Sequence, residues 1–265
     1  MNDLKNKKLF LLDMDGTIYL GDRLFDDTVR FLQKIKDIGG KYLFLTNNSS
    51  RGADAYVKKL ASLGISSNNE DFLTSTDATI LYIKGKFSGR KFYCMGTDSF
   101  TKQISDSGIP VTTEPDDDTF GLLISNDTEL SFKKLEDASR LLLRGVEYIA
   151  TNPDWVCPTE FGSVPDCGSF AEMLSHINGR LPYFIGKPEP AMIELAMEKF
   201  GYTKEETLMV GDRVYTDIAS GVRAGVDTVL VLSGEGVVAD IDKYKVSPTY
   251  VMRDVGELCD RLENI

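Results

Sequence analysis

Two aspartates stand two positions apart directly after an apolar run near the N-terminus. The stretch LLDMDGT, residues 11 to 17, carries Asp13 and Asp15. If the chain stays extended through Met14, its period of two points both carboxylates to the same side. Two unit charges about 4 Å apart repel by roughly 4 kcal/mol at an effective dielectric constant near 20. Both therefore ionise readily only beside a cation, or else one stays protonated and serves acid/base chemistry.

A third carboxylate, Asp212, follows another apolar run, TLMVG at 207–211. One such aspartate alone is more often a turn residue or a helix cap, but three at matching strand ends favour a metal site. An oxygen-rich site suits Mg²⁺, a hard cation that binds through few carboxylates together with phosphate. Asp217, shortly after Asp212, either caps the helix that begins there or orients this site.

Further polar groups stand at the ends of two other strand-like runs. Thr46 ends YLFLT and is followed by Asn47, at a turn into a helix where partial positive charge favours an anion. Capping of that helix is the alternative for Thr46. Lys187 ends YFIGK, before Pro188, and can pair with a phosphate and an aspartate together. A solvated loop lysine is the alternative there.

Strand-like runs alternate with helical stripes at both ends of the chain, which predicts an α/β fold with a parallel, Rossmann-like sheet. In such a sheet, ligands bind outside the carboxyl ends of the strands. The middle of the chain holds a strand and helix set of its own, of a usual domain size. We predict a core of residues 1–79 and 181–265 with an inserted α/β domain at 80–180. The strand segments expected in the core sheet are 8–12, 42–46, 183–187, 207–212 and 228–234.

Composition excludes several classes of protein. The 265 residues are 42% hydrophobic with a net charge of −11, and no basic stripe compensates that charge, so nucleic acid is not an expected partner. Uninterrupted apolar runs are far shorter than the roughly 20 residues of a membrane span, and no secretory signal is evident, which predicts a cytoplasmic protein without a membrane partner. His176, the single histidine, argues against multi-histidine zinc sites. Free thiols are expected, with a 157–167 disulfide as a less favoured alternative, for Cys94, Cys157, Cys167 and Cys259.

Spacing also rules out other ways of handling phosphate. Gly186 and Lys187 lack the earlier glycine of a Walker A loop, and no cysteine has an arginine six positions later. No dinucleotide fingerprint follows Gly234, because position 239 is alanine.

Four segments, taken in order, resemble the four motifs of the haloacid dehalogenase (HAD) superfamily of phosphotransferases. The insertion between the second and third motifs, with TNPD at 151–154, resembles the NagD-like, para-nitrophenyl phosphatase branch with its α/β cap domain. The four segments are DMDGT (13–17), TN (46–47), GKP (186–188) and GDRVYTD (211–217).

The resemblance implies a phosphoryl-transfer mechanism. Asp13 would be the nucleophile that forms an aspartyl-phosphate, and Asp15 the general acid and then the general base. Thr46 and Lys187 would hold the phosphoryl oxygens. Asn47 would contact the substrate phosphate or the leaving group.

The resemblance also implies Mg²⁺ as the cofactor. Asp212 would ligate it together with the carboxylate of Asp13 and the backbone carbonyl of Asp15. Asp217 would stand behind these ligands rather than on the metal.

These residues predict a Mg²⁺-dependent phosphomonoester hydrolase of small phosphorylated metabolites, such as sugar phosphates or nucleoside monophosphates, with para-nitrophenyl phosphate as an artificial substrate. The alternative is a non-catalytic metabolite-binding or regulatory protein on the same scaffold. A dehalogenase would have no need of Asp15 and Asp212. Substrate choice is expected to lie in the cap, where Trp155, Phe161 and Asp166 occupy the expected specificity stretch, although core packing explains the aromatic residues equally well. A homodimer through the cap follows from the resemblance alone.

Overall fold

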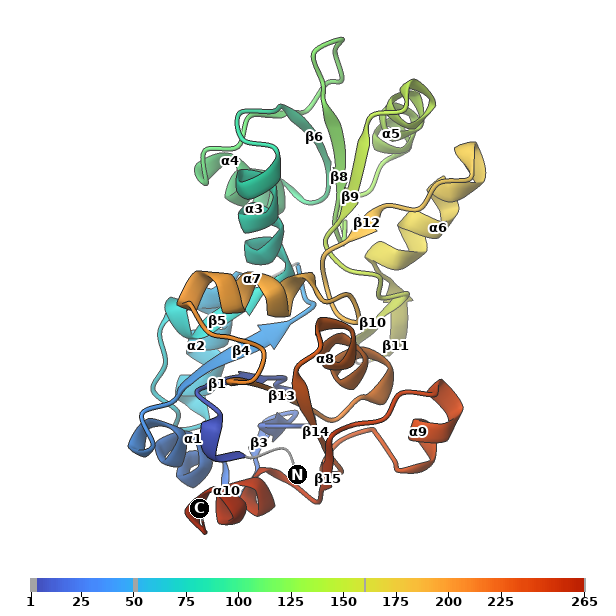
Figure 1. Cartoon of the computed structure of the whole chain (residues 1–265). Helices are drawn as coiled ribbons and strands as arrows, with labels where there is room; N and C mark the ends of the chain where they lie inside the picture. Colours follow the sequence, from blue (N-terminus) through green and yellow to red (C-terminus); the bar gives the residue numbers. More distant parts are fainter. Residues whose placement is uncertain (1–3, 50–51, 160, 265) are drawn as a thin grey trace. The chain divides into compact units, whose positions relative to one another are not determined.

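The computed structural model of the chain describes residues 4–49, 52–159 and 161–264 (Figure 1). The chain forms two compact units, each assembled from separate segments. The first unit comprises Met1–Thr46, Ala53–Leu73 and Lys187–Ile265, and the second comprises Asn47–Gly52 and Thr74–Gly186.

The first unit is built on a six-stranded sheet with β1 near its centre. Strand β1 (Leu9–Leu12) pairs in parallel with β13 (Thr207–Gly211) on one side and with β4 (Lys41–Thr46) on the other. All four residues of β1 are buried, as expected for a central strand covered on both faces. The sheet order is β15 (Tyr250–Met252), β14 (Asp227–Val231), β13, β1, β4 and β5 (Phe72–Thr74).

Helices of the first unit place an apolar stripe on this sheet. In α1 (Thr28–Asp37), Phe31, Leu32 and Ile35 are buried at helical spacing, and the Phe31 ring meets Phe10 of β1 edge-on at 6.3 Å. The other helices of this unit are α2 (Ala53–Ser62), α7 (Ala191–Phe200), α8 (Ala219–Ala224), α9 (Ala239–Tyr244) and α10 (Val255–Glu263). Two 3₁₀ turns, η1 (Leu4–Asn6) and η2 (Asn69–Asp71), and a π-helical turn, η3 (Val214–Ile218), are shorter. A small hairpin pairs β2 (Tyr19–Leu20) with β3 (Arg23–Leu24).

The second unit has a parallel sheet of its own and a separate hairpin. Capping residues mark both ends of helix α5 (Phe132–Arg144). The Ser131 side chain caps its N-terminus, and Gly145, in the left-handed region, ends the helix. The sheet order is β12 (Tyr183–Phe184), β9 (Glu147–Ala150), β8 (Gly121–Ile124), β6 (Phe92–Met95) and β7 (Val111–Thr112). The hairpin pairs β10 (Val156–Thr159) with β11 (Gly162–Pro165). The remaining helices are α3 (Ser75–Lys86), α4 (Asp98–Asp106) and α6 (Cys167–Asn178).

The predicted fold class, a Rossmann-like parallel-sheet core with an inserted α/β cap, is confirmed. The placement of the strand before Lys187 in the core sheet is wrong. That strand, β12, pairs with β9 in the second unit, and the N–H groups of Ile185 and Gly186 continue the ladder to the carbonyls of Ala150 and Thr151. An apolar run predicts a buried strand but does not indicate to which of two sheets the strand belongs. The predicted domain bounds, 1–79 with 181–265 and 80–180, stay a prediction.

Three further expectations can be compared with the structure. The structure places none of the four cysteines in a disulfide. Among the described residues, no helix is long and apolar enough to cross a membrane. In the predicted specificity stretch, Trp155 and Phe161 are exposed at 60% and 83%, which argues against core packing as their role.

Candidate active site

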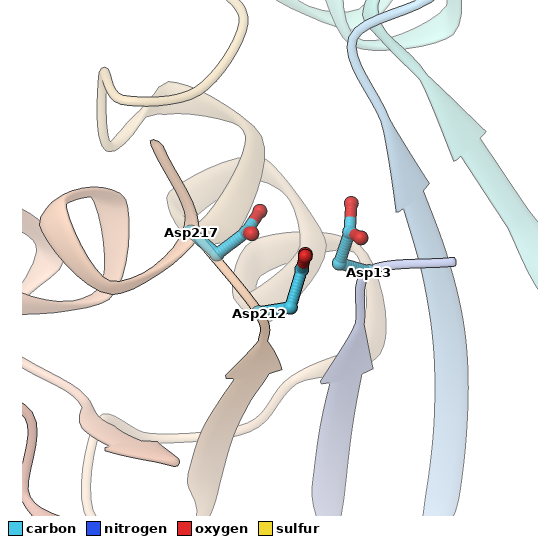
Figure 2. Close-up of side chains that lie close together, drawn as sticks. All are labelled: Asp13, Asp212 and Asp217. Carbon is cyan, nitrogen blue, oxygen red and sulfur yellow. The ribbon is translucent and has the colours of Figure 1, made fainter. Parts of the chain in front are cut away.

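Three carboxylates meet at the carboxyl ends of two adjacent strands of the first unit. Asp13 follows β1 and donates its backbone N–H to the carbonyl of Val210, in β13, at 2.9 Å. Asp212 follows β13 directly, and Asp217 lies in η3. One carboxylate oxygen from each of Asp13, Asp212 and Asp217 lies within 4.8 Å of the others, and Figure 2 shows the three side chains close together.

A buried lysine joins two of these carboxylates. The Lys187 Nζ donates to Asp13 Oδ1 at 2.6 Å and to Asp217 Oδ1 at 2.7 Å, and its side chain is only 4% exposed. Burial alone would disfavour the ammonium, but the charges of Asp13 and Asp217 outweigh it and hold the pKa of Lys187 above its ordinary value. Lys187 is therefore a fixed positive charge within the acidic cluster.

Burial also changes the proton affinity of two of the acids. It raises the pKa of Asp13 to about 7, with a further contribution from Asp217 and an opposing one from Lys187. It raises the pKa of Asp212 to about 6, again with help from the charge of Asp217. Without a further cation, these carboxylates take up protons near neutral pH.

Asp212 has one oxygen engaged and one without a partner. Its Oδ2 accepts the backbone N–H of Glu235 at 2.7 Å. Its Oδ1 is buried and has no hydrogen-bond partner within the described part of the chain, and the residue is 1% exposed. An unpaired buried carboxylate oxygen is costly, and such an oxygen is a suitable ligand for a hard divalent cation. The donor set around Asp212 therefore fits a metal ion.

Asp217 is held through both of its oxygens. Oδ1 accepts from Lys187, and Oδ2 accepts the backbone N–H of Arg213 at 3.1 Å. The N-cap residue of α8 is Ile218, so the predicted alternative that Asp217 caps this helix has no support in the contacts. A Cβ at Gly211 would overlap the Asp217 side chain, which explains the glycine that ends β13. Asp217 thus orients Lys187.

Asp13 and Asp15 occupy different surroundings. The Asp13 side chain is 17% exposed, whereas Asp15 is exposed and its carboxylate is not among the three that cluster in the described residues. The chain turns immediately afterwards, where Gly16 adopts φ +91° and donates its N–H to the carbonyl of Tyr19 at 2.7 Å. A side chain at Gly16 would be strained by this φ and would overlap the Asp212 carboxylate.

Thr46 and Asn47 fall on opposite sides of the division between the units. Thr46 ends β4, beside β1, with its hydroxyl 3.4 Å from the Tyr56 hydroxyl. Asn47 belongs to the second unit, where its amide donates to both carboxylate oxygens of Asp154 at 3.1 Å. Asn152 donates to the Asn47 carbonyl at 3.0 Å. The TNPD segment therefore holds Asn47 within the second unit.

Sequence reasoning missed the segment that packs on Asp212. Ser233, Gly234 and Glu235 follow β14, and Glu235 supplies the N–H that binds Asp212. A backbone donor leaves no side-chain signature. The available signal is the pair of glycines at 234 and 236, close after the apolar run of β14.

Comparison with known proteins agrees with this arrangement. The profile of the haloacid dehalogenase-like hydrolases matches residues 10–110, and a HAD-hydrolase-like profile matches residues 184–258. An acid sugar phosphatase of Staphylococcus aureus is 33% identical over 260 residues, which cover 98% of this chain and all of the relative. The chain belongs to the haloacid dehalogenase-like hydrolases.

Solved structures indicate which branch of the HAD superfamily this hydrolase resembles. The crystal structure of a 4-nitrophenylphosphatase from Thermotoga maritima superposes with a TM-score of 0.89 at 37% identity, covering 97% of this chain and 98% of that one. A structure described as a nagD protein superposes with a TM-score of 0.88 at 35% identity, covering 97% and 99%. The resemblance to the NagD-like, para-nitrophenyl phosphatase branch of the HAD superfamily is confirmed.

Proposed function

We propose that this HAD phosphatase is a Mg²⁺-dependent phosphomonoester hydrolase that acts on small phosphorylated metabolites through an aspartyl-phosphate on Asp13. The observation that carries the proposal is the pairing of Asp13 with Lys187 beside a buried, unpartnered oxygen of Asp212. The acid sugar phosphatase and nitrophenylphosphatase relatives support the reaction class.

The residues present fit a divalent cation. Asp13 and Asp212 would hold Mg²⁺ through carboxylate oxygens, and Asp15 would contribute its backbone carbonyl. When bound, Mg²⁺ supplies positive charge that offsets the charge of the transferring phosphoryl group. The unpartnered Asp212 Oδ1 supports this assignment, since a cation would satisfy it.

The protein groups divide the reaction into two displacements. An Asp13 carboxylate oxygen forms a bond to phosphorus while the ester oxygen leaves with a proton from Asp15. A water molecule then attacks phosphorus, Asp15 takes its proton, and the bond between Asp13 and phosphorus breaks. Lys187 and Thr46 hold phosphoryl oxygens throughout, and Asp217 keeps Lys187 in place. Asn47 is proposed to contact the substrate phosphate or the leaving group.

Substrate choice is assigned to the second unit, as the cap. Trp155 and Phe161 stand exposed around its hairpin, and Asp166 is a buried N-cap of α6 that accepts the Cys167 N–H at 2.6 Å. Sugar phosphates and nucleoside monophosphates are the proposed substrate classes. A cytoplasmic location and a homodimer through the cap are part of the same proposal, with neither nucleic acid nor membrane as a partner.

The proposal is tested by phosphate release from para-nitrophenyl phosphate and a panel of sugar phosphates and nucleoside monophosphates. We expect release with Mg²⁺ and none after removal of divalent metal with EDTA, with recovery when Mg²⁺ is restored. Release that persists in EDTA would contradict the metal dependence. Failure to hydrolyse any ester of the panel would favour the non-catalytic alternative.

Mg²⁺ is expected to stabilise the protein more at pH 8 than at pH 5.5. The pKa values of about 7 for Asp13 and about 6 for Asp212 lie above those of an unfolded chain, so the metal-free folded state binds extra protons between about pH 4 and 7. Its stability therefore falls as pH rises through this window. Mg²⁺ binds the ionised acids, so its affinity rises with pH, about tenfold per unit for each proton displaced.

Differential scanning fluorimetry across a Mg²⁺ titration at each pH measures this difference in affinity. A metal-induced rise in melting temperature that is equal at both pH values would contradict it. NaCl at matched ionic strength is the control for general ionic effects.

Asp15→Asn is expected to separate metal binding from turnover. The substitution leaves the backbone carbonyl in place and removes the proton donor, so Mg²⁺ affinity should change by less than about threefold while kcat falls by about 10²- to 10⁴-fold. Calorimetric titration with Mg²⁺ and steady-state kinetics give the two quantities. Lost Mg²⁺ binding in this variant would assign the Asp15 carboxylate to the metal instead.

A further inference from the structure

The segment Ser233–Gly236, which we call the SGEG loop, follows β14 and belongs to none of the four motifs. Its Ser233 hydroxyl donates to the carbonyl of Gly16 at 2.7 Å. Its Glu235 N–H donates to Asp212 Oδ2, also at 2.7 Å. The loop therefore joins the two turns that follow β1 and β13, the strands that present Asp13 and Asp212.

The glycines of the SGEG loop allow this close approach. A Cβ at Gly234 would overlap the Asp212 carboxylate and lie 2.7 Å from the Gly16 Cα. A Cβ at Gly236 would overlap the backbone carbonyl oxygen of Asp212. Only glycine at these two positions lets the backbone pack directly on Asp212.

The Glu235 side chain binds the SGEG loop to the segment that follows Asp212. Its Oε2 accepts from the Arg213 guanidinium Nε at 2.9 Å, and its Oε1 accepts the Tyr215 hydroxyl at 3.3 Å. The Tyr215 ring in turn lies 5.2 Å from the Tyr244 ring of α9. Because Arg213 follows Asp212 in the chain, Glu235 is bound to the same segment that its own N–H orients.

We propose that the SGEG loop is a positioning device for the metal ligand Asp212. The Glu235 N–H fixes Oδ2, so Oδ1, which is buried and without a partner in the described chain, is held ready for the cation. Groups that orient a metal ligand in this way commonly change metal affinity by about 10- to 100-fold when removed. The proposal rests on the proposed function, since it takes Asp212 as a ligand of Mg²⁺.

Mg²⁺ affinity measured by calorimetric titration without substrate tests the proposal. Gly234→Ala should weaken Mg²⁺ binding about tenfold or more, because its Cβ must displace the Asp212 carboxylate. Glu235→Ala should weaken it about threefold or more. Glu235→Gln, whose amide oxygen can still accept from Arg213 and whose amide N–H can donate to the Tyr215 hydroxyl, should restore most of the loss. The metal-free melting temperature of Glu235→Ala should stay within about 2 °C of wild type, since an exposed ion pair contributes little to stability.

Two matched controls separate positioning from general effects. Glu189→Ala removes another exposed ion pair of the first unit, with Arg223 at 2.6 Å, and Gly85→Ala adds a Cβ where no atom lies within 4 Å. Both should bind Mg²⁺ like wild type. Unchanged affinity in Glu235→Ala would overturn the proposal, whether or not Gly234→Ala folds. Absence of Mg²⁺ binding by the wild-type protein would instead overturn the proposed metal dependence, and the loop's role with it.

Discussion

Replacement of Asp13 by asparagine is expected to lower kcat/KM for para-nitrophenyl phosphate by about 10⁴-fold or more, because the amide cannot form the covalent phosphoryl intermediate. Asparagine has nearly the same shape, and Lys187 keeps Asp217 as a partner at 2.7 Å, so the fold should persist. The assay is nitrophenol release at saturating Mg²⁺.

Stability distinguishes this loss of chemistry from unfolding. Burial raises the pKa of Asp13 to about 7, so its ionised form destabilises the metal-free folded state above that pH. At pH 8 without metal, Asp13→Asn should therefore melt at or above the wild-type temperature. Activity within tenfold of wild type would remove Asp13 from the nucleophile's role, and a markedly lower melting temperature would show that the kinetic loss is structural.

Replacement of Lys187 by methionine is expected to impair both stability and activity. It leaves Asp217, whose side chain is 1% exposed, and Asp13 without their shared cation. Breaking a buried ion pair in this way costs about 3–5 kcal/mol, or on the order of 10 °C in melting temperature. Loss of its charge beside the phosphoryl group should lower kcat by about 10²- to 10³-fold. Thermal melts and steady-state kinetics measure the two effects.

The pH dependence of stability and a double variant test whether unpaired carboxylates cause the destabilisation of Lys187→Met. At pH 5 the destabilisation should be smaller than at pH 8, because carboxylates that have lost their cation take up protons. Lys187→Met combined with Asp217→Asn should regain stability without regaining activity. Lys102→Met, which breaks an exposed pair with Asp106, should change stability by less than about 1 kcal/mol. A Lys187→Met protein that melts like wild type would contradict this account.

Much of the site could be predicted because strand ends in a parallel sheet converge. Asp13 and Asp212 are brought together by the register of β1 with β13, where Leu12 pairs with Val210. Lys187 was predicted to pair an aspartate, and it does so with Asp13 and Asp217, although the strand before it lies in the other sheet. The predicted pairing of Lys187 with an aspartate is therefore correct, although the strand before it was assigned to the wrong sheet.

Two other features could not be predicted, for different physical reasons. Asn47 carries the amide expected at a phosphate, but its bond to Asp154 joins residues 107 positions apart, and no local pattern encodes such a contact. The Glu235 contact with Asp212 is made by a backbone N–H, which any residue but proline provides. Only the flanking glycines mark that position, and glycine pairs occur in many turns.

The most direct test of the account is the detection of a phosphoryl group on Asp13 itself. Asp15→Asn should be mixed with Mg²⁺ and para-nitrophenyl phosphate, whose leaving group needs little protonation, then quenched in acid and mapped by mass spectrometry. We expect a burst of nitrophenol and the mass of one phosphoryl group on the peptide that contains Asp13, absent when Asp13→Asn is added to the same variant. A burst without a label on that peptide, or a label on another residue, would contradict the proposed mechanism.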